Sequence, residues 1–182
     1  GDLTPAGLPL ADLVRSLTRG RLGAHDPAHL DPDLDPTTLP RAAGWRPLFG
    51  QAGAAERHLQ RMGVGPGDLF LFYGWFRRIE RHARTWRYVP GAPDLHVIWG
   101  WLQVSERLPS RDRAALPIWG LAHPHAARPE PREPDSLYLA AGRLALPGLA
   151  LDLPGAGRFP RFHAGLQLTA PGGPRSTWQL PP

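Results

Sequence analysis

The carboxylates and histidines best suited to chemistry lie in a Pro-rich stretch near the start of the chain. Residues 24–40 have the sequence AHDPAHLDPDLDPTTLP and include His29, Asp31 and Asp33. A carboxylate beside an imidazole can carry out general acid–base catalysis, and both groups can bind a metal ion. The stretch also fits an ordered acidic surface loop, because aspartate favours turns and a residue before proline avoids the helical region. It lacks the glycine and final glutamate of a calcium-binding loop.

Two further histidines form an AHPH motif later in the chain. His123 and His125 are two residues apart, so an extended backbone places their side chains on the same side. With His29 or His163 they could bind a metal ion through imidazole nitrogens. A Pro-rich surface turn is the alternative explanation. We therefore predict no bound metal and no cofactor, and we keep His123 and His125 as metal-ligand candidates.

The rest of the chain offers no familiar catalytic motif. The sequence contains no cysteine, which excludes disulfides, thiolate metal sites and a cysteine nucleophile. It has no HExxH motif, no Walker loop and no serine nucleophile elbow. The catalytic residues are therefore unknown from the sequence, with His29, Asp31 and Asp33 as candidates.

Aromatic residues and arginines form a second candidate site, one suited to binding. The segment GPGDLFLFYGWF is followed by the arginine-rich stretch RRIERHARTWR, and HVIWGWLQV supplies two more tryptophans. Aromatic rings stack on bases, at about 1–3 kcal/mol per base, and arginine binds phosphate. The alternative is that these rings form an ordinary core. The predicted nucleotide-binding residues are Gln51, Tyr73, Trp75, Arg77, Arg78, Trp99 and Trp101.

Two helices are predicted in the first third of the chain. Apolar residues at helical spacing indicate a helix over about 9–19 and another over 51–62. The second helix should bury Leu59 and Met62 and leave Glu56 in solvent.

Short strands bounded by glycine and proline make up most of the remaining chain. The uninterrupted apolar run 69–76 predicts a strand buried on both faces, and 96–104 predicts its neighbour. A polar loop is expected over 105–117, a strand within 135–146 and a short strand near 166–168. Strands that outnumber the helices favour an α+β fold, with a small curved sheet or barrel and helices on one side.

Composition limits the class of protein further. At 182 residues the chain is predicted to be one domain, 1–182, and its 23 Pro and 21 Gly indicate many loops. No apolar run approaches the ~20 residues of a membrane span and no leader is visible, so we expect a cytoplasmic protein without membrane contact. The net charge is +5, and all 21 basic residues are arginine, which suits a polyanionic partner. A GC-rich genome also explains the absence of lysine.

The order helix, turn, strand, turn, strand in AAERHLQRMGVGPGDLFLFYGWF and HVIWGWLQV resembles the centre of EVE, ASCH and related PUA-like domains. More closely, the chain resembles the nucleotide modification associated domain 3 (Nmad3) family. The segments that carry this resemblance are AHLDPDLDP, WRPLFGQAGAAERHL, GVGPGDLFLFYGWFR, YVPGAPDLHVIWGWLQV, AHPH, DSLYLA and LTAPGG. Such domains usually begin with a strand carrying a basic segment. This chain opens on GDLTPAG, so we expect that terminal segments are missing or that this member is trimmed.

The resemblance implies a small curved sheet or pseudo-barrel of PUA-like type in a bacterial or phage base-modification system. It implies DNA, RNA or a modified nucleotide as the ligand, and other base-modification enzymes as partners. The first hypothesis is a binding module that holds a modified base in an aromatic pocket. In the PUA-like arrangement Gln51 would open a helix beside that pocket. The second is an enzyme that installs or edits a nucleobase modification with its His/Asp loops, and the third is a structural subunit of a modification complex.

Overall fold

The computed structural model describes residues 10–129 and 133–180, and their contacts divide the chain into two compact units. We call the first the hairpin unit, which comprises Gly1–Ala28, Tyr73–Ile98 and Phe162–Pro182. We call the second the sheet unit, which comprises His29–Phe72 and Trp99–Arg161. The expectation of a single domain over 1–182 stays a prediction.

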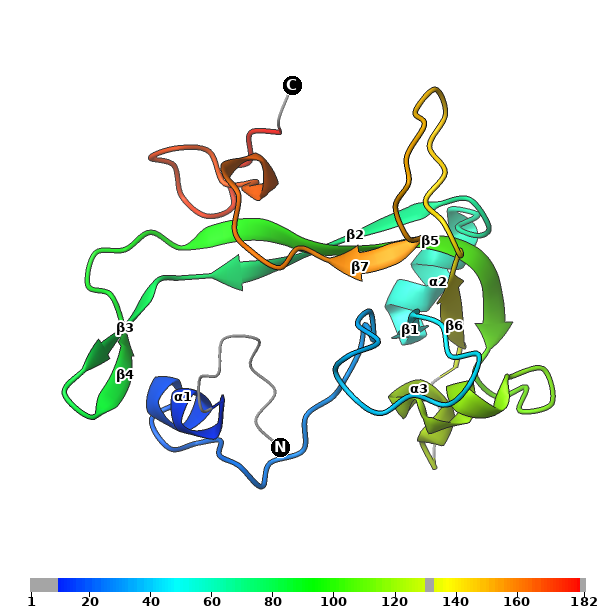
Figure 1. Ribbon diagram of the computed structural model, residues 1–182, viewed down its shortest axis with the longest axis horizontal. Helices are drawn as coiled ribbons and strands as arrows, with labels where there is room; N and C mark the ends of the chain where they lie inside the picture. The colour runs from blue at the N-terminus through cyan, green and yellow to red at the C-terminus, as the bar shows by residue number, and fades with distance from the viewer. Residues whose placement is uncertain (1–9, 130–132, 181–182) are drawn as a thin grey trace. The chain divides into compact units, whose positions relative to one another are not determined.

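The structure contains α-helices, short 3-10 helices (η) and strands (Figure 1). In order they are α1 (Leu10–Leu17), β1 (Leu48–Ala52), α2 (Gly53–Arg61), β2 (Leu69–Phe76), β3 (Ile79–His82), β4 (Thr85–Tyr88), β5 (Leu95–Pro109), η1 (Ile118–Ala122), α3 (Pro124–Ala127), β6 (Asp135–Ala140), β7 (Ala156–Arg158) and η2 (Ala164–Leu166). The predicted helices 9–19 and 51–62 are confirmed apart from their ends, and Pro9 lies outside the described residues. The strand predicted over 69–76 is confirmed in full.

A five-stranded sheet has the order β1-β6-β5-β2, with β7 also paired to β5. The pairs β1–β6, β5–β6 and β5–β7 are antiparallel. Gly50 lies opposite Leu137 and Ala52 opposite Asp135, so the end of β1 meets the start of β6. The mixture of helices and antiparallel sheets confirms the predicted α+β class. Within residues 10–129 and 133–180 the strands close no barrel.

Strand β6 is the centre of the sheet unit, since all of its residues are buried. Successive residues of a strand point to opposite faces, so β6 supplies two clusters of core side chains. One cluster is formed by Leu34, Leu102, Val104, Tyr138, Ala140 and Ala156, with Phe49, Phe70 and Phe72 packed against it. The other is formed by Leu48, Leu116, Ala126, Leu137 and Leu139.

The buried face of α2 differs from the predicted one. Glu56, expected in solvent, is 0% exposed, whereas Met62, expected in the core, is 68% exposed. The Glu56 carboxylate accepts hydrogen bonds from Tyr138 Oη at 2.8 Å, Gln60 Nε2 at 2.8 Å and an Arg107 guanidinium nitrogen at 3.1 Å. A buried carboxylate is tolerated when such partners satisfy it. The predicted exposure of Glu56 is wrong because two of these partners come from strands distant in sequence, and the apolar spacing of a helix carries no information about them.

Strand β2 is covered on one face rather than on both. Phe70 and Phe72 pack against the core, whereas Leu71, Tyr73 and Trp75 are 53%, 50% and 64% exposed. These exposed residues share one face of the strand by their alternate spacing. The predicted burial on both faces is therefore wrong, because apolar content alone does not reveal whether anything covers the second face.

Strand β5 is longer than predicted and extends into residues expected to form a loop. Leu108 lies opposite Leu137 and Pro109 opposite Ser136 on β6. The pairing register shifts between Val104 and Glu106, a β-bulge or irregularity. The polar stretch 105–117 therefore begins as strand.

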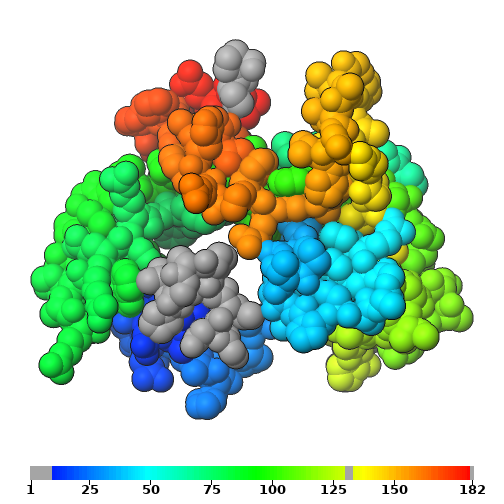
Figure 2. Space-filling model, in the orientation of Figure 1, coloured from blue at the N-terminus to red at the C-terminus, as the bar shows by residue number. Residues whose placement is uncertain are grey.

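The hairpin unit contains α1, the β3–β4 hairpin and the last part of the chain. The arginine-rich stretch after β2 forms this hairpin, with Ile79 opposite Tyr88, and α1 lies against β4 (Figure 2, green and blue). The strand predicted near 166–168 is instead η2 followed by a single bridge from Gln167 to Val97. No helix in the described part of the chain is long and apolar enough to cross a membrane.

Candidate functional site

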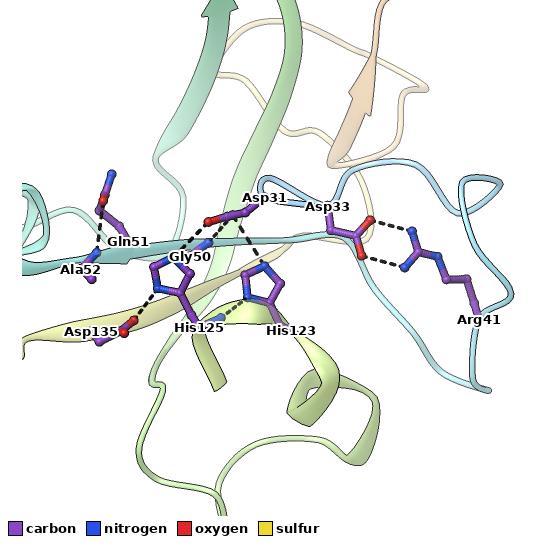
Figure 3. Close-up of polar contacts among 9 residues, drawn as sticks. All are labelled: Asp31, Asp33, Arg41, Gly50, Gln51, Ala52, His123, His125 and Asp135. Atoms are coloured by element: carbon purple, nitrogen blue, oxygen red, sulfur yellow. Dashed lines mark hydrogen bonds and ion pairs between the residues drawn. The ribbon is translucent and has the colours of Figure 1, made fainter. Parts of the chain in front are cut away.

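A cluster of histidine and aspartate side chains lies in the sheet unit, where α3 contacts β1 and β6 (Figure 3). We call Asp31, His123, His125 and Asp135 the His–Asp cluster. Asp31 comes from the loop before β1, the two histidines from the start of α3, and Asp135 from the first position of β6. The exposed fractions of these side chains are 6%, 2%, 6% and 0%. Segments far apart in sequence therefore bring four polar side chains into one buried place.

The two oxygens of Asp31 have different partners. Oδ1 accepts a hydrogen bond from the Gly50 backbone N–H at 2.8 Å and lies 3.6 Å from His123 Nε2. Oδ2 lies 3.1 Å from His125 Nε2. Burial raises the pKa of Asp31, but the neighbouring His123 and His125 rings and the Gly50 N–H outweigh burial and hold the pKa well below its usual range. Asp31 is therefore a carboxylate at neutral pH.

His125 lies between two carboxylates. Its Nδ1 is 2.6 Å from Asp135 Oδ1, and its Nε2 faces Asp31. A proton on Nδ1 that is donated to Asp135 leaves Nε2 either to carry a second proton or to offer a lone pair. Burial lowers the pKa of His125, but the hydrogen bonds with Asp31 and Asp135 raise it by more, so the pKa lies above its usual value.

His123 caps α3 and keeps one ring nitrogen without a partner. Its Nδ1 accepts a hydrogen bond from the His125 backbone N–H at 3.3 Å, and Pro124 starts the helix. In a neutral ring this leaves the proton on Nε2. That buried Nε2, 3.6 Å from Asp31, has no hydrogen-bond partner among the described residues. Such unsatisfied buried atoms are few in native proteins and call for an explanation.

Gly50 allows the two imidazole rings to approach the backbone of β1. A Cβ atom at this position would lie 2.4 Å from Cδ2 of His125 and 2.9 Å from Cε1 of His123. Both distances are too short for non-bonded atoms. Glycine is therefore required here for close approach, and the same backbone donates the hydrogen bond to Asp31.

His29 extends the cluster towards solvent. Its ring centroid is 5.9 Å from that of His125, and its side chain is exposed. His29, Asp31 and His125 each offer one potential metal-binding atom, and these three atoms lie within 4.8 Å of one another. The structure thus brings together four candidates from the two Pro-rich segments: His29, Asp31, His123 and His125.

Asp33, the remaining catalytic candidate, lies in a different environment. Its carboxylate receives two hydrogen bonds of 2.6 Å from Arg41 and points away from His125 (Figure 3). Arg41 in turn stacks on the Trp45 ring at 4.0 Å. These contacts assign Asp33 to the support of the loop before β1.

Tyr73 and Trp75 belong to the exposed face of β2 in the hairpin unit. The Tyr73 ring contacts His96 and Trp178 edge-on, with centroids 5.3 Å and 4.9 Å away. The Arg175 guanidinium stacks on Trp75 at 4.0 Å. The exposed Arg77 lies 3.8 Å from Asp94 and 5.3 Å from the Tyr88 ring centre, and Arg78 is exposed beside it.

The other predicted binding residues lie in the sheet unit. Trp99 packs against the core through Phe72, and Trp101 donates a hydrogen bond to the Pro154 carbonyl at 3.0 Å. Gln51 was expected to open a helix, but it belongs to β1, and its side chain accepts a hydrogen bond from the next backbone N–H.

Sequence reasoning missed Asp135 and Gly50. Asp135 opens the fully buried strand of DSLYLA, and an acidic residue at the start of such a run was the available signal. Gly50 carried no sequence signal, because its importance depends on the histidines of α3.

The fold and the cluster together define an α+β protein with a buried histidine–carboxylate centre. The family model of nucleotide modification associated domain 3, Nmad3, matches residues 1–182, so the chain belongs to this family and the resemblance is confirmed. The name of the family associates it with nucleotide modification. Comparison with curated proteins and with solved structures found no match.

Proposed function

We propose that this chain is an enzyme that installs or edits a nucleobase modification, with the His–Asp cluster as its reaction centre. The observation that supports this function is the convergence of Asp31, His123, His125 and Asp135 in one buried place. Burying polar and ionisable groups is costly, and groups with perturbed pKa values concentrate at functional sites. The family's association with nucleotide modification supports the class of substrate. The hypothesis ranked second on the sequence thus becomes the first.

The cluster has the parts of a reaction centre, and an exposed histidine lies beside it. Asp135 orients the His125 ring, and the Gly50 N–H orients Asp31. The reactive edge that remains is formed by His125 Nε2 and Asp31 Oδ2. His29 is exposed and lies beside this edge, which marks the side of the cluster nearest to solvent.

The test is mass spectrometry of nucleosides after incubation of modified and unmodified DNA and RNA with the protein. The wild-type protein should change the mass of one nucleoside, and His125→Ala should abolish that change. His58→Ala, an exposed histidine of α2, is the matched control and should behave as wild type. Unchanged nucleosides across all substrates, with and without added divalent metal ions, would refute the function.

We also propose that the hairpin unit binds nucleic acid, which retains the first hypothesis in a narrower form. Trp75 is 64% exposed, and the neighbouring arginines Arg77 and Arg78 are exposed too. An exposed aromatic ring can stack on a base while arginines bind phosphate. The order α2, turn, β2 and β5 supports a PUA-like core for this binding role.

A further inference from the structure

We propose that His29, Asp31 and His125 bind one divalent transition-metal ion, with Asp135 and His123 supporting them from outside the coordination sphere. This inference deepens the proposed function and rests on it, since it assigns a cofactor to the same cluster. It departs from the expectation of no metal that the sequence alone favoured.

The hydrogen bonds leave the right atoms free for a metal ion. Asp135 accepts the Nδ1 proton of His125, so once Nε2 gives up any second proton its lone pair points towards Asp31. On Asp31, Oδ1 is occupied by the Gly50 N–H, while Oδ2 faces His125. One imidazole nitrogen and one carboxylate oxygen thus face each other as ligands.

The spacing of these two atoms agrees with shared coordination. Metal–ligand bonds of about 2.0–2.1 Å separate two neighbouring ligand atoms by about 2.8–3.4 Å in octahedral or tetrahedral geometry. The distance from His125 Nε2 to Asp31 Oδ2 is 3.1 Å. His29 supplies the third atom, within 4.8 Å of the others, and its exposed side chain can rotate to close the remaining gap.

The groups behind the ligands are those that metal sites use. A carboxylate that accepts the second N–H of a ligating histidine fixes the orientation of the ring and raises its basicity, and Asp135 has this position. A metal site would also give a role to the buried Nε2 atom of His123. Its Nε2, without a hydrogen-bond partner in the described residues, lies 3.6 Å from Asp31 Oδ1, so a small shift of the carboxylate on metal binding would bring the two atoms into hydrogen-bond distance.

The donor set selects the class of ion. Two imidazoles with one carboxylate suit Zn²⁺, Fe²⁺, Co²⁺ or Mn²⁺, whereas Mg²⁺ and Ca²⁺ prefer oxygen ligands throughout. Soft ions that require thiolates are disfavoured because the chain has no cysteine. Three protein ligands leave coordination positions for water or substrate.

The experiment is a Co²⁺ titration of the full chain after removal of metal with a chelator, followed by visible absorption. We expect the absorption to saturate at one Co²⁺ per chain, to be displaced by Zn²⁺ and to be unaffected by Mg²⁺. His29→Ala, at an exposed position that does not support the core, should weaken Co²⁺ binding at least about tenfold. Asp135→Asn should weaken it about 10–100-fold, and His58→Ala should leave it unchanged.

Two results would overturn the metal site. One is the absence of a saturable Co²⁺ signal in a chain whose circular dichroism is that of a folded protein. The other is a signal that His29→Ala and Asp135→Asn both leave unaltered, since the ion would then lie elsewhere. Thermal melts of each variant separate loss of a ligand from loss of fold.

The metal site and the proposed enzyme can fail separately. Binding of Co²⁺ without any change in nucleosides, in every metal-loaded form, would support the site and refute the enzyme. A change in nucleosides by chelator-stripped protein would support the enzyme and refute a metal cofactor. Neither result depends on the other measurement.

Discussion

Gly50 is a single residue on which the geometry of the His–Asp cluster depends. The absence of a side chain lets the rings of His123 and His125 lie against β1, and the N–H of the same residue orients Asp31. A backbone donor is a precise way to hold a carboxylate, since it moves only if the strand moves.

We expect Gly50→Ala to destabilise the protein, because the new methyl group would lie 2.4 Å from the His125 ring. Inserting a methyl group into a filled site typically costs about 1–3 kcal/mol, measurable as a lower urea midpoint. Gly142→Ala is the matched control, because no atom lies within 4 Å of its Cβ position and its φ is not positive. A Gly50→Ala variant as stable as Gly142→Ala would contradict the close approach.

The sequence identified most residues of the candidate site individually, but it did not predict which of them lie close together in the fold. His29, Asp31, His123 and His125 stand out as chemical groups in Pro-rich segments. Asp33 looks equivalent to Asp31 in the sequence, yet Arg41 engages it instead. The difference depends on which neighbour folds back onto each carboxylate, and no local pattern encodes that.

At the scale of elements, the polar network around Glu56 ties α2 to β5 and β6. Tyr138 and Arg107 are strand residues that reach the same helical carboxylate. Burial, and then the hydrogen bond with Glu56, raise the pKa of Tyr138, so the phenol remains a donor at neutral pH. The network explains why a helix with Met62 in solvent stays attached to the sheet.

Tyr138→Phe should therefore destabilise the protein without changing its shape. Loss of the hydroxyl leaves Glu56 Oε2 buried without that donor, which costs about 1–3 kcal/mol. Urea unfolding measures the loss, and Tyr88→Phe, at a residue 44% exposed, should have almost no effect. Equal midpoints for the two variants would show that Glu56 does not need this bond.

Helices and strands were predicted well where the apolar spacing is regular or where glycine and proline mark the ends. Their buried faces were predicted poorly, because contacts with residues distant in sequence determine them. The glycines and prolines around 69–76 mark β2 correctly, and the helix over 51–62 follows from its spacing. The orientation of α2 and the cover over β2 were wrong, because both depend on contacts made after the chain folds.

For the whole molecule, the net charge of +5 bears on the nucleic-acid proposal. A positive chain attracts polyanions at long range, and this attraction weakens as salt increases. Stacking by an aromatic ring depends less on salt, so the two contributions are separable by experiment.

We expect the full chain to bind labelled single-stranded oligonucleotides with an affinity that falls as salt rises. Trp75→Ala should raise Kd about 5- to 150-fold at fixed salt, which corresponds to the 1–3 kcal/mol typical of one stacked base. Ile118→Ala, another exposed apolar residue, 87% exposed and in the sheet unit, should leave Kd unchanged. Fluorescence anisotropy at several salt concentrations provides the measurement, and identical affinities for the two variants would remove Trp75 from the interface.

The burial of β6 has a consequence for how local unfolding affects the His–Asp cluster. Asp135 stands on a strand with no exposed residue, and Tyr138 on the same strand anchors α2. Local fraying, which usually disables a loop-borne site long before a protein melts, cannot reach this carboxylate unless the sheet itself opens. Asp135 should therefore keep its position for as long as the sheet holds, whereas Asp31, on the loop before β1, and the histidines of the short α3 should lose theirs first.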